Sequence, residues 1–96
     1  MYVIAANLTA IPSQRDKLLQ LVSTLAQGSL TEEACKRFEI YQSVEDANEL
    51  IMYEEWLDLD DTVMLPHKAA GYYRQFDELR DAVVAKSSIN KYRVCE

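Results

Sequence analysis

The chain has 96 residues, of which 10 are lysine or arginine and 16 are aspartate or glutamate, so its formal net charge is −6. This length allows one domain, residues 1–96, and an apolar content of 49% indicates a globular chain rather than a disordered one. The acidic balance argues against nucleic acid and against an anionic membrane as partners, because both repel a negatively charged surface.

The first element that the sequence predicts is a strand over residues 2–8, whose two faces are both largely apolar, with Asn7 as the one polar intruder. Pro12 ends this strand, since proline cannot donate to a strand ladder. Ser13 then offers an N-cap for a helix, and Gly28 is the expected C-cap of that helix. The apolar residues of the helix recur at helical spacing and form one stripe: Leu18, Leu21, Val22, Leu25 and Ala26.

The second part of the chain reads as a β-hairpin, with strands over residues 38–42 and 50–57 and a turn-forming loop over residues 45–48. The preceding segment, 29–34, has room for another short turn of helix. In the second strand of the hairpin both faces are again apolar, as in a strand that is covered on two sides. One face carries Leu50, Met52 and Trp56, and the other carries Ile51, Tyr53 and Leu57.

The last third of the chain predicts helical structure followed by a strand. Acidic residues after Trp56 suit a helix N-terminus, and Pro66 is expected to prevent a regular helix from running through its position. The pattern becomes helical again from His67, and residues 77–86 are predicted as helix. Two serines then break the helix, and residues 89–95 alternate as a final strand.

The resulting order, β-α-β-β-α-β, is the ferredoxin-like plan of the α+β class, a four-stranded antiparallel sheet with helices on one face. Because these helices cover only one face, the second apolar face of the first and third strands is left over. A second copy of the same sheet would cover it economically, so the pattern predicts a homodimer joined through the sheets.

Cysteine usage and the start of the chain both favour the cytoplasm. Cys35 and Cys95 are far apart and form no C-x-x-C spacing, which leaves neither a zinc site nor a thioredoxin-type motif and favours two reduced thiols. The apolar start, residues 1–7, lacks a basic region and is too short for a signal peptide or a membrane span. We therefore expect a cytoplasmic protein.

Two polar residues are the candidates for catalysis. His67 is the only histidine, and histidine is the usual acid–base group near neutral pH, although a lone histidine is more often structural. Asn7 lies within an apolar strand, where a buried amide needs hydrogen-bond partners. It is equally suited to donate to a ligand oxygen or to bond a neighbouring loop.

The aromatic residues could line a pocket or fill the core. Glu54 and Trp56 share one strand face, and a paired indole and carboxylate can line an aromatic-binding site. Tyr72 and Tyr73 would face such a pocket from the helix side, although aromatic residues at helical spacing more often belong to the core. The acids near residues 54–61 indicate a solvated helix start rather than a metal site, and no loop suited to phosphate, flavin or nicotinamide is recognisable.

Several short motifs over nearly the whole chain resemble the antibiotic biosynthesis monooxygenase (ABM) domain. They include Tyr53-Glu54-Glu55-Trp56 and His67-Lys68-Ala69-Ala70-Gly71-Tyr72-Tyr73, and the most specific parts are the Glu54-x-Trp56 ending of the third strand and His67 on the following helix. The chain departs from the family pattern at Tyr72, where many members carry a second histidine.

The resemblance implies a dimeric α/β barrel that uses neither metal, flavin nor any other cofactor to oxidise a quinol, anthrone or polyphenol with dioxygen. It also implies His67 and Asn7 as catalytic residues, with Trp56, Tyr72, Tyr73 and Glu54 binding the substrate. Two alternatives stay open. One is a non-catalytic ligand-binding or stress-associated dimer of the same fold, and the other is a haem-degrading monooxygenase, a branch that this chain resembles at Asn7.

Overall fold

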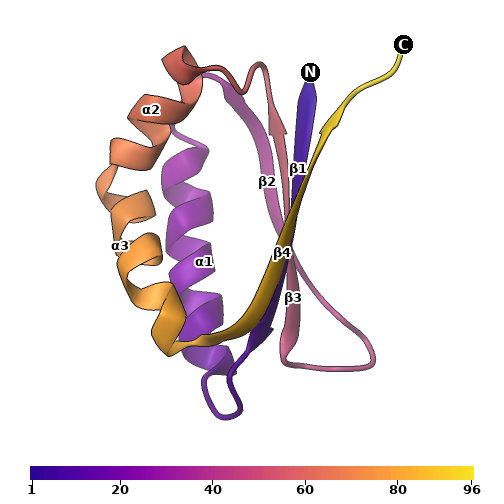
Figure 1. The fold of residues 1–96 in the computed structure, drawn as a ribbon, viewed down its shortest axis with the longest axis vertical. Coiled ribbons are helices and arrows are strands. Elements are labelled where there is room, and N and C mark those ends of the chain that lie inside the picture. The colour runs from indigo at the N-terminus through magenta and orange to yellow at the C-terminus, as the bar shows by residue number, and fades with distance from the viewer.

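Four antiparallel strands form a single sheet in the order β2-β3-β1-β4, in a computed structural model that describes residues 1–96. In chain order the elements are β1 (Tyr2–Ala10), α1 (Arg15–Ser29), β2 (Cys35–Gln42), β3 (Glu49–Trp56), α2 (Asp61–Ala69), α3 (Gly71–Leu79), the 3-10 turn η1 (Arg80–Ala82) and β4 (Val84–Arg93). All the helices lie on one side of the sheet (Figure 1). The predicted ferredoxin-like α+β plan is therefore confirmed, with the second helix divided into α2 and α3.

The core lies between α1 and the sheet and follows the predicted periodicities. All five residues of the expected α1 stripe are buried, and Leu18 and Val22 are completely inaccessible. On β3, alternate residues from Leu50 to Trp56 point toward the helices and are buried, while Ile51 and its neighbours point the other way. Each fully buried aliphatic side chain of this kind contributes about 1.5–3 kcal/mol.

The two ends of α1 differ from the sequence prediction. Ser13 does not cap the helix; it occupies a turn closed by a hydrogen bond from Gln14 N–H to the Ile11 carbonyl, at 2.9 Å. Its φ of 73° is the positive value that the second central position of a type II turn adopts, with Pro12 before it. Gly28 does not end the helix either, because α1 continues to Ser29.

Gly28 instead allows a close approach between α1 and α3. A Cβ atom at this position would lie 2.3 Å from ring carbons of Tyr72. The absence of a side chain therefore lets the tyrosine ring pack directly on the α1 backbone.

The break in the second helical region falls four residues after the expected one. Pro66 lies inside α2 and removes one N–H from the helical ladder without ending the helix. The chain breaks at Ala70, whose ψ of 146° is extended. The Ala70 carbonyl then accepts the first hydrogen bonds of α3, from the N–H groups of Tyr73 and Arg74 at 3.1 and 3.0 Å.

The helix predicted over residues 77–86 is too long, and the last strand begins earlier than expected. Leu79 ends α3, and β4 starts at Val84 and includes both serines that were predicted to be a break. Pairing with β1 explains the difference, because Ala10 and Thr9 lie opposite Val84 and Lys86. Likewise, the segment predicted to hold a further helical turn, 29–34, contains only the last residue of α1, Ser29, followed by turns and a bend over residues 30–34.

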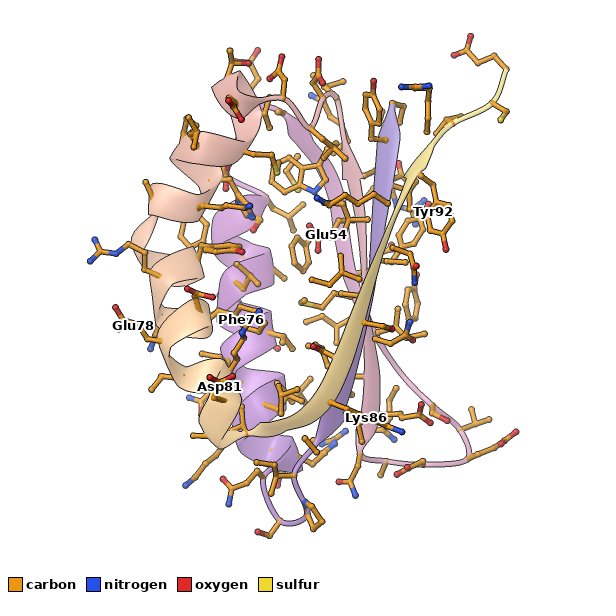
Figure 2. All side chains as sticks on the ribbon, viewed as in Figure 1. Glu54, Phe76, Glu78, Asp81, Lys86 and Tyr92 are labelled. Carbon is orange, nitrogen blue, oxygen red and sulfur yellow. The ribbon has the colours of Figure 1, made fainter.

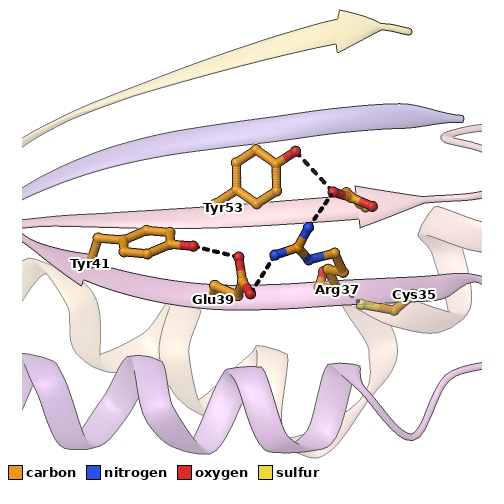
Figure 3. A network of polar contacts seen from close by, with 6 residues as sticks. Cys35, Arg37, Glu39, Tyr41 and Tyr53 are labelled. Atoms are coloured by element: carbon orange, nitrogen blue, oxygen red, sulfur yellow. Dashed lines mark hydrogen bonds and ion pairs between the residues drawn. The ribbon is translucent and has the colours of Figure 1, made fainter.

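The sheet face away from the helices is uncovered and carries a polar network over β2 and β3 (Figure 3). Arg37 forms ion pairs with Glu39 at 2.7 Å and with Glu55 at 3.4 Å. The hydroxyls of Tyr41 and Tyr53 donate to these two carboxylates.

No helix of the chain is both long and apolar enough to cross a membrane.

Candidate functional site

A cavity of about 330 Å³ lies between the helix-facing side of the sheet and the helices α2 and α3. Ten of its sixteen lining residues are hydrophobic, among them Met52, Met64 and Phe76. Glu54 projects from β3 toward the helices (Figure 2), and Phe76 lines the same space from α3. A concave, largely apolar site with a few polar groups is what small-molecule binding requires.

Glu54 is the acidic group deepest in this cavity. Its side chain is only 6% exposed, and it accepts a hydrogen bond of 2.9 Å from the indole N–H of Trp56. Burial raises the pKa of Glu54 from 4.5 to about 7, the Trp56 hydrogen bond lowers it, and the charge of Glu32 raises it further. A carboxyl group with this pKa exchanges a proton near neutral pH, as a general acid or base must.

His67 lines the same cavity and is held in place on one side by a carboxylate. The histidine is 5% exposed, and its Nδ1 lies 2.7 Å from Oε2 of Glu32. Its ring also makes edge contacts with Trp56 and Tyr73, with centroid distances of 4.6 and 5.0 Å. A carboxylate at Nδ1 favours the tautomer with its proton there, which leaves Nε2 as a hydrogen-bond acceptor.

Glu32 also accepts a hydrogen bond from Tyr72, which makes it the link between two predicted site residues. The Tyr72 hydroxyl donates to the same Oε2 atom at 2.6 Å. Burial, followed by this hydrogen bond and the charge of Glu32, raises the pKa of Tyr72 to about 12, so the phenol stays protonated. The resulting chain Tyr72–Glu32–His67 fixes the orientation of the imidazole.

The aromatic residues predicted as pocket walls divide into two groups. Tyr73 lines the cavity, and burial raises its pKa above the ordinary tyrosine value. Trp56 and Tyr72 do not line it. Trp56 is completely buried and lies behind Glu54 and His67, while Tyr72 packs on Gly28. These two residues therefore support the polar groups instead of forming the wall.

Asn7 is not brought together with the other predicted site residues. It is exposed on the opposite face of the sheet, in a shallow polar hollow that also includes Ser88 and Lys86. The reason is the alternation of β1, in which Ile4, Ala6 and Leu8 point toward the helices and Asn7 points away. Within one chain, Asn7 therefore has no access to a molecule in the cavity.

Comparison with known proteins identifies the family. The family model described as antibiotic biosynthesis monooxygenase (ABM) matches residues 1–83 of the chain. The chain belongs to the ABM family. It is 26% identical over 76 residues to the protein named "Putative monooxygenase YcnE" of Bacillus subtilis, a match that covers 79% of this chain and 78% of that protein.

Solved structures of other proteins share the fold of this ABM chain. PA3566 from Pseudomonas aeruginosa superposes with a TM-score of 0.87 at 23% identity, covering 98% of this chain and 94% of that one. The "Putative antibiotic biosynthesis monooxygenase" from Nitrosomonas europaea superposes with a TM-score of 0.88 at 18% identity, covering all of both chains. These likenesses support the ferredoxin-like architecture.

The two most specific parts of the ABM resemblance meet at the cavity, since Trp56, in the Glu54-x-Trp56 ending of β3, contacts His67 of α2 and donates its indole hydrogen bond to the carboxyl of Glu54.

Sequence reasoning missed Glu32, which lies 35 residues before His67 and in a turn without a recognisable motif. It also missed the basic residues at the cavity, of which Lys91 had been read only as part of an alternating strand. No group of three or more histidine, cysteine, aspartate or glutamate side chains is arranged to hold a metal ion.

Proposed function

We propose that this ABM protein is a monooxygenase that oxidises a small electron-rich aromatic compound, of the quinol, anthrone or polyphenol type, with dioxygen and without metal or flavin. One arrangement carries the proposal: Glu54, a buried carboxyl group whose burial raises its pKa to about 7, lines the same small, largely apolar cavity as His67. Such a pair suits a reaction whose difficult step is removal of a proton from a phenolic or benzylic position.

The proposed roles follow from the positions of the side chains. Glu54 or Nε2 of His67 accepts the proton of the substrate, and Glu32 stabilises the imidazolium that forms if His67 is the acceptor. Tyr73 supplies an aromatic wall for the flat substrate. Trp56 holds the Glu54 carboxyl by its indole hydrogen bond, and Tyr72 holds Glu32. Asn7 is left out of the proposed mechanism because it lies on the other sheet face.

The reaction balances without a further reductant. For an anthrone, C14H10O and O2 give the anthraquinone C14H8O2 and H2O. The substrate supplies all four electrons, one oxygen atom forms the new carbonyl and the other leaves as water. Removing the first proton produces an anion that gives up an electron to dioxygen more readily than the neutral compound does, and an apolar cavity keeps water away from it.

We also propose that two copies of the chain associate through the uncovered sheet face. Large side chains are exposed there: Tyr41 at 50%, Ile51 at 39% and Tyr92 at 54%. Tyr92 projects from β4 on the side away from the helices (Figure 2). A second sheet placed on this face would remove these side chains from water.

The test is oxygen uptake by metal-free, flavin-free protein with a panel of reduced naphthoquinols, anthrones and catechols, corrected for autoxidation. We expect protein-dependent uptake with an oxygenated product, and a kcat/KM that rises with pH through about 7 if ionised Glu54 is the base. Glu54→Gln is the matched control, because the amide still accepts from Trp56 but cannot take a proton. Binding of several compounds in a thermal-shift assay, without any uptake above background, would support a non-catalytic binding module instead.

A further inference from the structure

The charge at the cavity is opposite to the charge of the chain as a whole. Aspartate and glutamate exceed lysine and arginine by 16 to 10 in the sequence, yet three of the five lysine, arginine, aspartate and glutamate residues that line the cavity are basic. They come from three different elements: Lys68 from α2, Arg80 from η1 and Lys91 from β4. Sequence patterning gives no reason for this convergence.

Two of these basic side chains have no acidic partner. Arg80 lies 3.9 and 4.0 Å from the carboxylates of Asp77 and Asp81, which partly neutralise it. Neither Lys68 nor Lys91 forms an ion pair with any acidic side chain of the chain. Both are exposed. They can therefore meet an anion at the mouth of the cavity without first breaking an existing ion pair.

The strand register places Lys91 in line with Glu54. Ile4 of β1 lies opposite Glu54 of β3 on one side and opposite Lys91 of β4 on the other, so the three residues form one row across the sheet. All three side chains line the cavity. Two strand spacings separate the backbone of Lys91 from that of Glu54, a distance of about 10 Å.

We infer that the cavity takes an aromatic hydroxy-carboxylate, with its hydroxyl at Glu54 and its carboxylate at Lys91 and Lys68. This inference rests on the proposed function and narrows its substrate to compounds with the two groups at opposite ends of the ring system. The edge strand β4 is exposed along almost its whole length, and Ile89, next to Lys91 on the same face, is 56% exposed. The carboxylate end therefore lies at the open edge of the cavity, where it keeps part of its hydration.

The size of the cavity agrees with such a ligand. A volume of about 330 Å³ is at the lower end of the range of about 300–1,000 Å³ that small-molecule sites span. A bicyclic aromatic acid fits within this volume. The row from Lys91 to Glu54 sets the direction of its long axis, and Phe76 and Tyr73 face it from α3.

The experiment is calorimetric binding of 6-hydroxy-2-naphthoate and of its neutral counterpart, 6-hydroxy-2-naphthamide, to the full-length protein. Neither compound is a quinol, so binding is measured without turnover. We expect the carboxylate to bind at least about fivefold more tightly than the amide, because a partly hydrated charge-assisted contact contributes about 1 kcal/mol or more. This ratio should fall as the salt concentration rises.

Lys91→Gln should lower the carboxylate-to-amide ratio while leaving amide binding unchanged, and Lys68 keeps part of the preference in this variant. Lys86→Gln is the matched control, since Lys86 is an exposed lysine of the same strand on the opposite face of the sheet, and it should keep the wild-type ratio (Figure 2). Equal binding of acid and amide by the wild type, or an unchanged ratio in Lys91→Gln, would overturn the inference.

The outcomes also separate this inference from the proposed function. Selective binding of the carboxylate without any oxygen uptake would refute the monooxygenase and leave the anion site in place. Oxygen uptake with neutral quinols, together with equal binding of the carboxylate and the amide, would support the monooxygenase and refute the anion site.

Discussion

Replacing Glu54 with glutamine should change how the stability of the protein depends on pH. The folded protein keeps the Glu54 proton up to about pH 7, whereas the unfolded chain releases it near 4.5. Between these values the folded state binds more protons than the unfolded state, so the free energy of unfolding falls as pH rises. At about 1.4 kcal/mol for each pH unit, the loss attributable to Glu54 by pH 8 is about 3 kcal/mol.

Glu54→Gln removes this loss, because the amide is neutral at every pH and its oxygen still accepts the Trp56 hydrogen bond. The variant should match the wild type near pH 4.5 and exceed it by about 3 kcal/mol at pH 8. Urea unfolding at pH 5, 6, 7 and 8, at one fixed protein concentration, measures the difference. Trp56 is the only tryptophan and contacts Glu54, so its fluorescence reports the transition directly.

All other titrating groups are common to the two proteins and cancel in the difference. A difference in unfolding free energy that stays constant from pH 5 to pH 8 would refute the reasoning, because it would mean that Glu54 ionises in the folded state as it does in the unfolded chain. Loss of the transition in Glu54→Gln at pH 5 would show instead that the amide cannot occupy the site of the protonated acid.

Three further predictions concern packing, catalysis and assembly. Gly28→Ala should lower the free energy of unfolding by about 1–3 kcal/mol in urea, because its Cβ would strike the Tyr72 ring. Gly71→Ala is the control: a Cβ there has open space, so the free energy of unfolding should change by about 1 kcal/mol or less. Equal effects of the two substitutions would contradict the close packing at Gly28. His67→Gln should lower turnover on the order of 10²-fold with the far-UV circular dichroism unchanged, and unchanged turnover would place the chemistry elsewhere. Sedimentation equilibrium at micromolar concentration should give twice the chain mass of 11.0 kDa, and a clean monomer would exclude the homodimer.

The amino-acid sequence determined the element types and the main core on its own. Alternation in the strands and helical spacing in α1 are local patterns, and they identified the β-α-β-β-α-β order and the buried stripe of α1 correctly. Element boundaries failed where a tertiary contact overrode a local signal. Gly28 was read as a helix end because glycine favours C-caps, yet its actual constraint is the Tyr72 ring, 44 residues further along the chain. Val84 to Lys86 reads as helix, but pairing with β1 draws it into the sheet.

The candidate site was predictable only in part. Glu54, Trp56 and His67 could be singled out because their types are unusual in their local patterns and match a family motif. The role of Asn7 could not be resolved, because both faces of β1 are apolar and the sequence does not show which face the helices cover. Only the tertiary structure places Asn7 on the uncovered face.

The electrostatics of the site were decided by folding alone. The Glu54 pKa of about 7 comes from burial, which no local pattern specifies. Glu32 reaches His67 and Tyr72 across 35 and 40 residues of chain. Lys91 and Glu54 share a row only because β1 lies between β3 and β4 in the sheet. Charge interactions depend on distance and on exclusion of water, and both are set when distant segments pack together.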